Sequence, residues 1–116
     1  MPLYESVIVA RQDITKSQLD NLVDEFGSII EENGGNIKKT EYWGLKNLAY
    51  EINKNKKAHY TMLILETAPE SIAEYERKMR INEDIIRYIT IKVDGFEDKP
   101  SIMMQNASDN SNYKDK

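Results

Sequence analysis

Few residues in this chain of 116 could carry acid–base, nucleophilic or metal chemistry. The chain has no cysteine, which excludes thiol nucleophiles, disulfides and cysteine-ligated metal sites. His59 is the single histidine, and it stands beside Tyr60 without the second ligand or base that a site at this position needs. We therefore predict that His59 is structural or makes a polar contact.

Two carboxylate pairs and one glycine pair are the remaining candidates. Glu31-Glu32 and Glu83-Asp84 are adjacent in sequence, and neighbours on a helix point in different directions, so neither pair favours an acid–base dyad. Gly34-Gly35 lacks the spacing of a phosphate-binding glycine motif. The sequence thus predicts a protein without catalytic residues, without a cofactor and without a metal site.

Lysine and aromatic residues gather in the middle of the chain. Residues 36–60 carry six lysines against two glutamates, a net charge of +4, whereas the whole chain has −4 and residues 12–35 have −5. Charges more than about 8–10 Å apart are largely screened, so this block can bind anions despite the overall charge. Rings among lysines suit stacking on unpaired bases and contact with phosphate. The lysines are Lys38, Lys39, Lys46, Lys54, Lys56 and Lys57, and the rings are Tyr42, Trp43, Tyr50 and Tyr60.

Two simpler interpretations of this block stay open. The lysines could belong to a solvated hairpin whose charged edge prevents aggregation. Trp43 and Tyr50 could pack rather than bind, because strands favour aromatic residues in any case.

The hydrophobic pattern predicts the elements that must position the block. Thr15 and Gln18 form a capping box ahead of an apolar stripe at helical spacing. Pro69 suits the first turn of a second helix, and Gly44 predicts a bulge or bend in a long strand. The expected elements are a strand over 3–10, a helix after Thr15 that stops at Asn33-Gly34-Gly35, a strand over 37–52, a polar turn over 53–56, a strand over 59–66, a helix from Pro69 and a strand over 85–93.

The order β-α-β-β-α-β is typical of the α+β ferredoxin-like fold, a four-stranded antiparallel sheet with two helices on one face. We expect one domain over residues 1–94 and a flexible polar tail over 95–116. Both alternating sets of residues 85–93 include apolar side chains, so the sequence does not decide which set faces the helices. The other face is expected to be partly apolar, which is typical of a partner surface.

Two sequence patterns, a membrane helix and a secretory signal, bear on the compartment. No apolar run reaches the roughly 18–20 residues of a membrane helix. The first residues, Met1 to Glu5, do not form a basic region followed by an apolar stretch, so no secretory signal is predicted. We expect a cytoplasmic protein with neither a membrane nor DNA as its partner.

Three segments resemble one family. Residues 43–54, Trp-Gly-Leu-Lys-Asn-Leu-Ala-Tyr-Glu-Ile-Asn-Lys, resemble the signature of the bacterial small-subunit ribosomal protein six family. Residues 57–60 (Lys-Ala-His-Tyr) and 80–87 (Arg-Ile-Asn-Glu-Asp-Ile-Ile-Arg) are similar to it as well, and so is Tyr4-Glu5 before the first strand. The resemblance extends over about residues 1–93. The family usually has Arg at one or both positions after Trp-Gly, where this chain has Leu45 and Lys46.

The resemblance implies a structural protein of the cytoplasmic ribosome without catalytic activity. It implies binding to the central domain of small-subunit ribosomal RNA as a pair with small-subunit ribosomal protein eighteen. With the lysine block, it predicts RNA contacts at Lys38, Lys39, Lys46, Tyr50, Lys54, Lys56, Lys57 and Arg87, and partner contacts at Trp43, Tyr60 and Tyr88. Arg87 is included because it interrupts an Ile-rich strand, although a salt bridge would explain it equally well.

Two alternatives use the same fold for another function. One is a small-molecule-binding regulatory domain, since this fold carries many functions. The other is a hydrolase of the acylphosphatase type, which needs an Arg in a phosphate loop after the first strand. Arg11 occupies that place but is followed by Gln12-Asp13 rather than by glycines, so this alternative ranks last.

Overall fold

The strands and helices follow one another in the predicted order. The computed structural model describes residues 1–52 and 54–95, and the predicted tail lies outside the described residues apart from Gly95. The elements are β1 (Leu3–Arg11), α1 (Lys16–Glu32), β2 (Asn36–Ile52), β3 (Asn55–Glu66), α2 (Pro69–Arg80) and β4 (Ile85–Val93).

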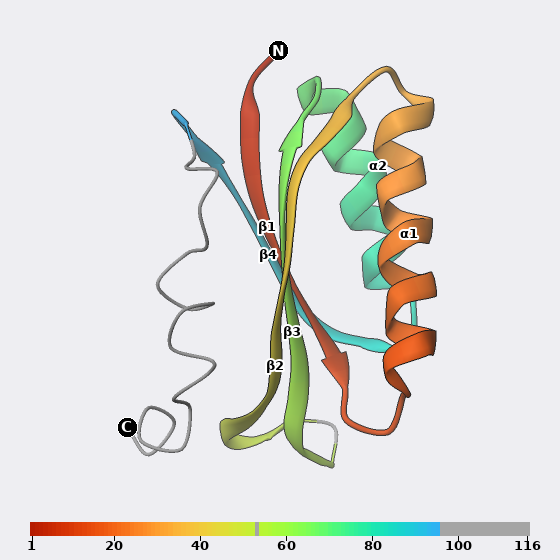
Figure 1. Cartoon of the computed structure of the whole chain (residues 1–116), viewed down its shortest axis with the longest axis vertical. Coiled ribbons are helices and arrows are strands. Elements are labelled where there is room, and N and C mark those ends of the chain that lie inside the picture. Colours follow the sequence, from red (N-terminus) through yellow and green to blue (C-terminus); the bar gives the residue numbers. More distant parts are fainter. Residues whose placement is uncertain (53, 96–116) are drawn as a thin grey trace.

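The four strands form one antiparallel sheet in the order β2-β3-β1-β4. Both helices lie against the same face of this sheet, as Figure 1 shows. The ferredoxin-like prediction is therefore confirmed. The topology leaves β2 and β4 as the two edge strands and places β1 and β3 in the centre.

The helix-facing core is built from the predicted apolar stripe of α1. Thr15 and Gln18 form the predicted capping box, with the Gln18 amide donating to Thr15 Oγ1 at 3.1 Å. Phe26, which is 1% exposed, meets the ring of Tyr75 edge to face at 5.9 Å between centroids. The Tyr75 hydroxyl lies 2.8 Å from Ser6 Oγ of β1, and burial raises the pKa of Tyr75, so the hydroxyl stays protonated.

The end of α1 requires both glycines that follow Asn33. Gly34 has φ +85°, a left-handed conformation that glycine adopts without a Cβ penalty. Gly35 donates its amide to the Ile30 carbonyl at 2.9 Å, and a Cβ on it would lie 2.7 Å from the Glu66 carbonyl oxygen. The two residues therefore close the helix and allow β2 to begin directly against the end of β3.

Two details of the long hairpin extend the sequence prediction. Gly44 has φ +106° at a register shift between Tyr42 and Gly44, so the predicted irregularity is confirmed as a bulge. β3 begins at Asn55 rather than at His59, because the hairpin pairs Ile52 with Asn55. The expected four-residue turn over 53–56 is thus too long, and the prediction of its length was wrong.

The position of Phe26 predicts a large effect of its removal. Phe26→Ala should lower the free energy of unfolding by about 3–5 kcal/mol, because it deletes a buried ring and leaves a cavity. Urea titration measures this change. The matched control is Glu25→Ala, an exposed residue on the same helix, which should change stability by less than about 0.5 kcal/mol. A decrease below about 1 kcal/mol for Phe26→Ala would contradict the packing of this ring in the core.

Candidate RNA and protein interface

The face of the sheet opposite the helices carries no helix of residues 1–52 or 54–95, and we call it the open face. The strand register assigns the side chains of β4, which the sequence left undecided. Tyr88 pairs with Ile8 of the core and therefore points toward the helices. Arg87 and Ile89 pair with Val9 and Val7 and point to the open face.

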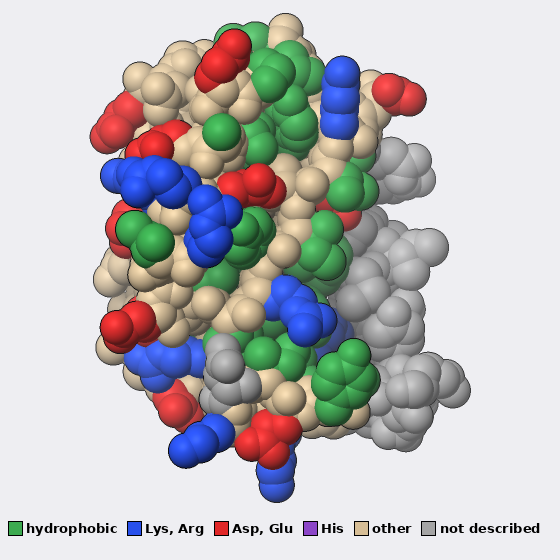
Figure 2. Space-filling view, turned by 180° about the vertical axis from the view of Figure 1, so that it is seen from behind, with side chains coloured by type: hydrophobic (Ala, Val, Ile, Leu, Met, Phe, Trp, Pro, Cys, Tyr) green, Lys and Arg blue, Asp and Glu red, His purple; other side chains and the backbone are tan. Residues whose placement is uncertain are grey.

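The centre of the open face is apolar. Met62 and Ile64 of the central strand β3 are buried there, with Val7 of β1 beside them. Ile89 and Ile91 of the edge strand β4 are 53% and 52% exposed. Figure 2, seen from behind, shows hydrophobic side chains at the surface among basic and acidic ones from top to bottom of the molecule. Exposed apolar side chains gathered in this way are typical of a surface that binds another macromolecule.

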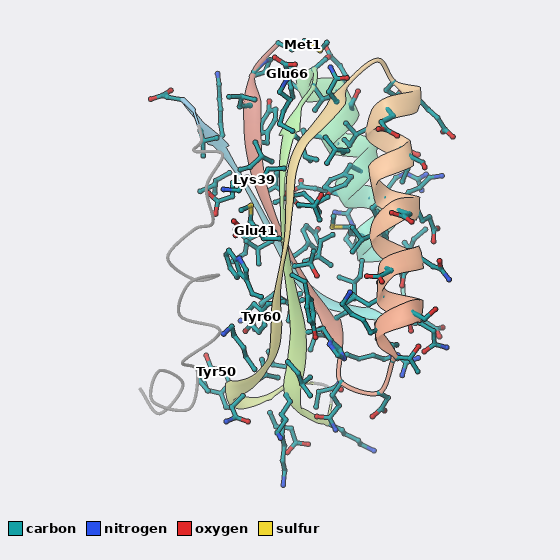
Figure 3. All side chains as sticks on the ribbon, in the orientation of Figure 1. Met1, Lys39, Glu41, Tyr50, Tyr60 and Glu66 are labelled. Carbon is teal, nitrogen blue, oxygen red and sulfur yellow. The ribbon has the colours of Figure 1, made fainter. Side chains whose placement is uncertain are left out.

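Strand β2 adds a polar cluster to this face. Glu41, which is 5% exposed, accepts a hydrogen bond from Trp43 Nε1 at 2.8 Å and pairs with Lys39 Nζ at 3.2 Å. The carboxylate therefore holds the Trp43 indole on the open face and neutralises the charge of Lys39. Figure 3 shows Lys39, Glu41, Tyr60 and Tyr50 in succession down the side of the sheet away from the helices.

Beyond the bulge, three predicted residues meet around one hollow. Tyr50 of β2, Tyr60 of β3 and Arg87 of β4 line a hollow of about 130 Å³ on the open face. Tyr50 is 73% exposed and Arg87 is exposed, whereas Tyr60 is half-buried. A guanidinium that shares a hollow with two rings can contact phosphate while the rings stack on bases.

The far end of the hairpin carries most of the positive charge. Residues 46–57 hold four lysines and one glutamate, a net charge of +3. Lys54, Lys56 and Lys57 are exposed, and within the described residues none of these three forms an ion pair with a carboxylate. Lys46 pairs with Ala58 in the ladder and so lies on the open-face side. We call residues 46–57 the basic hairpin.

Two predicted site residues lie away from this group. Lys38 is eight residues before Lys46, about 26 Å along an extended strand, and its Nζ is 3.9 Å from Glu66 Oε1. Tyr88 lies on the helix side of the sheet, packed against the core. The structure therefore places Tyr50, Tyr60 and Arg87 around one hollow, with Trp43 and Lys46 on the same face of the sheet. Lys38 and Tyr88 lie away from the hollow. The sequence missed Ile89 and Ile91, because their face could not be assigned before the register was known.

His59 and Arg11 are both engaged within the protein. His59 is 8% exposed, and its Nδ1 lies 2.9 Å from the Tyr42 hydroxyl, in agreement with a structural role. Burial raises the pKa of Tyr42, partly offset by Lys16, so the hydroxyl stays protonated. Arg11 Nε donates to Asp84 Oδ1 at 2.7 Å, which ties the guanidinium to a carboxylate rather than to a phosphate loop.

The described part of the chain also bears on metal binding and membrane insertion. Residues 1–52 and 54–95 contain no group of three or more histidine or carboxylate side chains that could hold a metal ion. Within the same residues, neither helix combines the length and the apolar character needed to cross a bilayer.

The Tyr42–His59 contact gives a stability prediction. Tyr42→Phe should lower the free energy of unfolding by about 1–3 kcal/mol, because it leaves a buried imidazole nitrogen without its partner. Tyr50→Phe is the control, since its exposed hydroxyl is solvated in both states. Thermal or urea unfolding of the two variants makes the comparison, and equal stability of both would show that the contact contributes nothing.

Sequence comparison relates this chain to ribosomal proteins. The family model of ribosomal protein S6 matches residues 3–92. Small ribosomal subunit protein bS6 of Zymomonas mobilis is 51% identical over 117 aligned positions, which span 100% of this chain and 94% of that protein. The bS6 protein of Methylobacterium sp. (strain 4-46) is 52% identical over 105 positions, 90% of this chain and 78% of that protein.

A solved structure agrees with the sequence comparisons. The crystal structure of 30S ribosomal protein S6 from Thermotoga maritima superposes with a TM-score of 0.75 at 31% identity, over 79% of this chain and 87% of that chain. The match to the family model extends from β1 into β4 and so includes the strands that carry the open face and the basic hairpin. The chain belongs to the ribosomal protein S6 family.

Proposed function

We propose that this protein binds the central domain of small-subunit ribosomal RNA as a pair with small-subunit ribosomal protein eighteen. Its family makes it a structural ribosomal protein of the small subunit rather than an enzyme. The observation that supports binding to both RNA and a protein partner is that the surface has a basic part and an apolar part. The basic hairpin holds a net charge of +3, while the adjoining open face is apolar at its centre.

The basic hairpin supplies contacts of the kind that RNA requires. Lys54, Lys56 and Lys57 present mobile ammonium groups to phosphate, each as a point charge rather than as the bidentate fork of arginine. Tyr50 and Arg87, on either side of the hollow, offer a ring and a planar cation to an unpaired base. Contacts of these two kinds favour a loop or bulge of folded RNA over a regular duplex.

The open face supplies the protein contact. Trp43 and Tyr60 stand at one side of it, and Ile89 and Ile91 are about half exposed at the other, 53% and 52%. Large rings around an apolar centre are typical of the core of a protein interface. A protein of net charge −4 has little long-range attraction for a polyanion, so a basic partner on this face would supply the attraction that the chain lacks.

The lysines of the hairpin give a prediction for RNA binding. With the partner present, Lys46→Ala and Lys56→Ala should each weaken binding of a central-domain RNA fragment. The slope of log affinity against log salt should fall by roughly 0.7–0.9 for each phosphate that the variant no longer neutralises. Lys78→Ala is the control, because Lys78 lies on α2 and its Nζ is 3.9 Å from Glu74 Oε2. An unchanged slope in the hairpin variants would mean that these lysines form only a solvated edge.

The pairing gives a second prediction. The chain alone should bind the RNA fragment weakly, and addition of protein eighteen should raise its affinity by about 5–150-fold, a coupling of about 1–3 kcal/mol. By linkage, RNA should raise the affinity for the partner by the same factor. Titration in both directions measures the two factors, and equal affinity with and without the partner would exclude an obligate pair.

A matched pair of variants tests where the partner docks. Ile89→Glu places a charge on the open face and should abolish the coupling. Ile81→Glu places the same charge at the end of α2, where Ile81 is 68% exposed, and should leave the coupling intact. Loss of coupling in both variants, or in neither, would contradict docking on the open face.

A further inference from the structure

The basic hairpin needs support from outside its own two strands. The regular pairing of β2 with β3 runs to Asn47 and Lys57, then shifts register before it resumes at Ile52 and Asn55. Two isolated strands are marginally stable in water at best. Lys54 and Lys56, two of the lysines that the proposed function requires, therefore stand where the ladder of the hairpin is irregular.

Gln12 provides that support from the loop between β1 and α1. Its side-chain Oε1 accepts hydrogen bonds from the backbone amides of Lys56 and Lys57, at 3.2 and 3.0 Å. Its own backbone amide donates to Asn55 Oδ1 at 3.0 Å. One carbonyl oxygen has two lone pairs, so a single glutamine can hold both lysine amides at once.

The support extends to the turn of the hairpin as well. Asn55 is 7% exposed, and its Nδ2 donates to the Ile52 carbonyl at 3.2 Å, across the connection between β2 and β3. Because β1 pairs with β3 only as far as Arg11 and Ala58, the Gln12 side chain takes over where the main-chain ladder of β1 ends. We call Gln12 and Asn55 the bracket.

The loop that carries Gln12 is itself anchored on both sides. Arg11 donates its backbone amide to the Asp84 carbonyl at 2.9 Å and its Nε to Asp84 Oδ1 at 2.7 Å. Three residues after Gln12, Thr15 caps α1. The bracket therefore joins the hairpin to a loop that is held by β1, by the start of β4 and by the first helix.

We infer that Gln12 is a positioning residue. It holds the basic hairpin in the orientation that RNA recognises, and it contributes no charge to the contact with RNA. The inference rests on the proposed function. Lysines on a fixed backbone lose less conformational freedom on binding than lysines on a loose one, so the bracket raises affinity by preorganisation. Removal of the Gln12 side-chain acceptor changes the position of the lysines but not their number or charge.

The test separates position from charge. Gln12→Met keeps the length and volume of the side chain and removes the acceptor for both amides. Hydrogen exchange at the Lys56 and Lys57 amides should then rise by roughly fivefold for each hydrogen bond removed. Affinity for a central-domain RNA fragment, with protein eighteen present, should fall by about fivefold or more, while the salt slope stays at the wild-type value because the lysines are unchanged.

The matched control is Gln18→Met, the same substitution in the capping box of α1. Gln18 Oε1 also accepts a backbone hydrogen bond, from Thr15 N at 2.9 Å, so the control costs some stability without touching the hairpin. It should leave exchange at Lys56 and Lys57 and RNA affinity at wild-type values. An equal decrease of affinity in both variants would show that the loss of RNA binding comes from lower global stability, and it would overturn the inference.

Two further measurements test the inference even if Gln12→Met does not fold. Gln12→Glu keeps an oxygen acceptor and should retain slow exchange at both lysine amides, although its charge weakens RNA binding. In the wild-type chain these two amides should already be protected, and free exchange there would overturn the bracket directly. If the wild-type pair does not bind the RNA at all, the proposed function fails, whereas wild-type affinity in Gln12→Met overturns the positioning role alone.

Discussion

Two helices can cover one face of a four-stranded sheet, and the chemistry of the other face follows from that constraint. α1 and α2 bury one side of β1, β3 and β4 with an apolar core that includes Phe26 and Tyr75. The strands alternate, so every inward side chain has an outward neighbour. Where that neighbour is Ile89 or Ile91, apolar surface is left for a second macromolecule to bury.

The same layering separates the charges. The helix α1 carries five acids and one lysine, a net charge of −4, while the basic hairpin, with its net charge of +3, belongs to the sheet. At physiological salt the Debye length is about 8 Å, so exposed carboxylates farther than this from Lys56 are largely screened there. The overall charge of −4 therefore limits long-range attraction without cancelling a local contact.

Local signals are sufficient to predict the elements but not the pairings between them. Thr15, Gly44 and Pro69 each determine a backbone feature by their own chemistry, and the structure has a cap, a bulge and a helix start at these positions. The face of Ile89 and the contact of Lys38 with Glu66 depend on strand register, a long-range property that the composition of a strand does not encode. The early start of β3 also depends on a partner strand, which explains why the polar composition of residues 53–56 indicates a longer turn than the one that forms.

A cluster of lysines is thus only part of what an RNA-binding surface needs. Charge alone gives attraction that any flexible basic segment could supply, and it carries little information about orientation. Orientation requires a backbone held in place, and in this chain the sheet ladder of β1 stops at Arg11, before the lysines begin. The neutral side chain of Gln12, one residue later, accepts hydrogen bonds from the backbone amides of Lys56 and Lys57 and so continues the ladder. A residue that contributes no charge can therefore affect how the lysines are presented, and the pattern of basic residues does not reveal it.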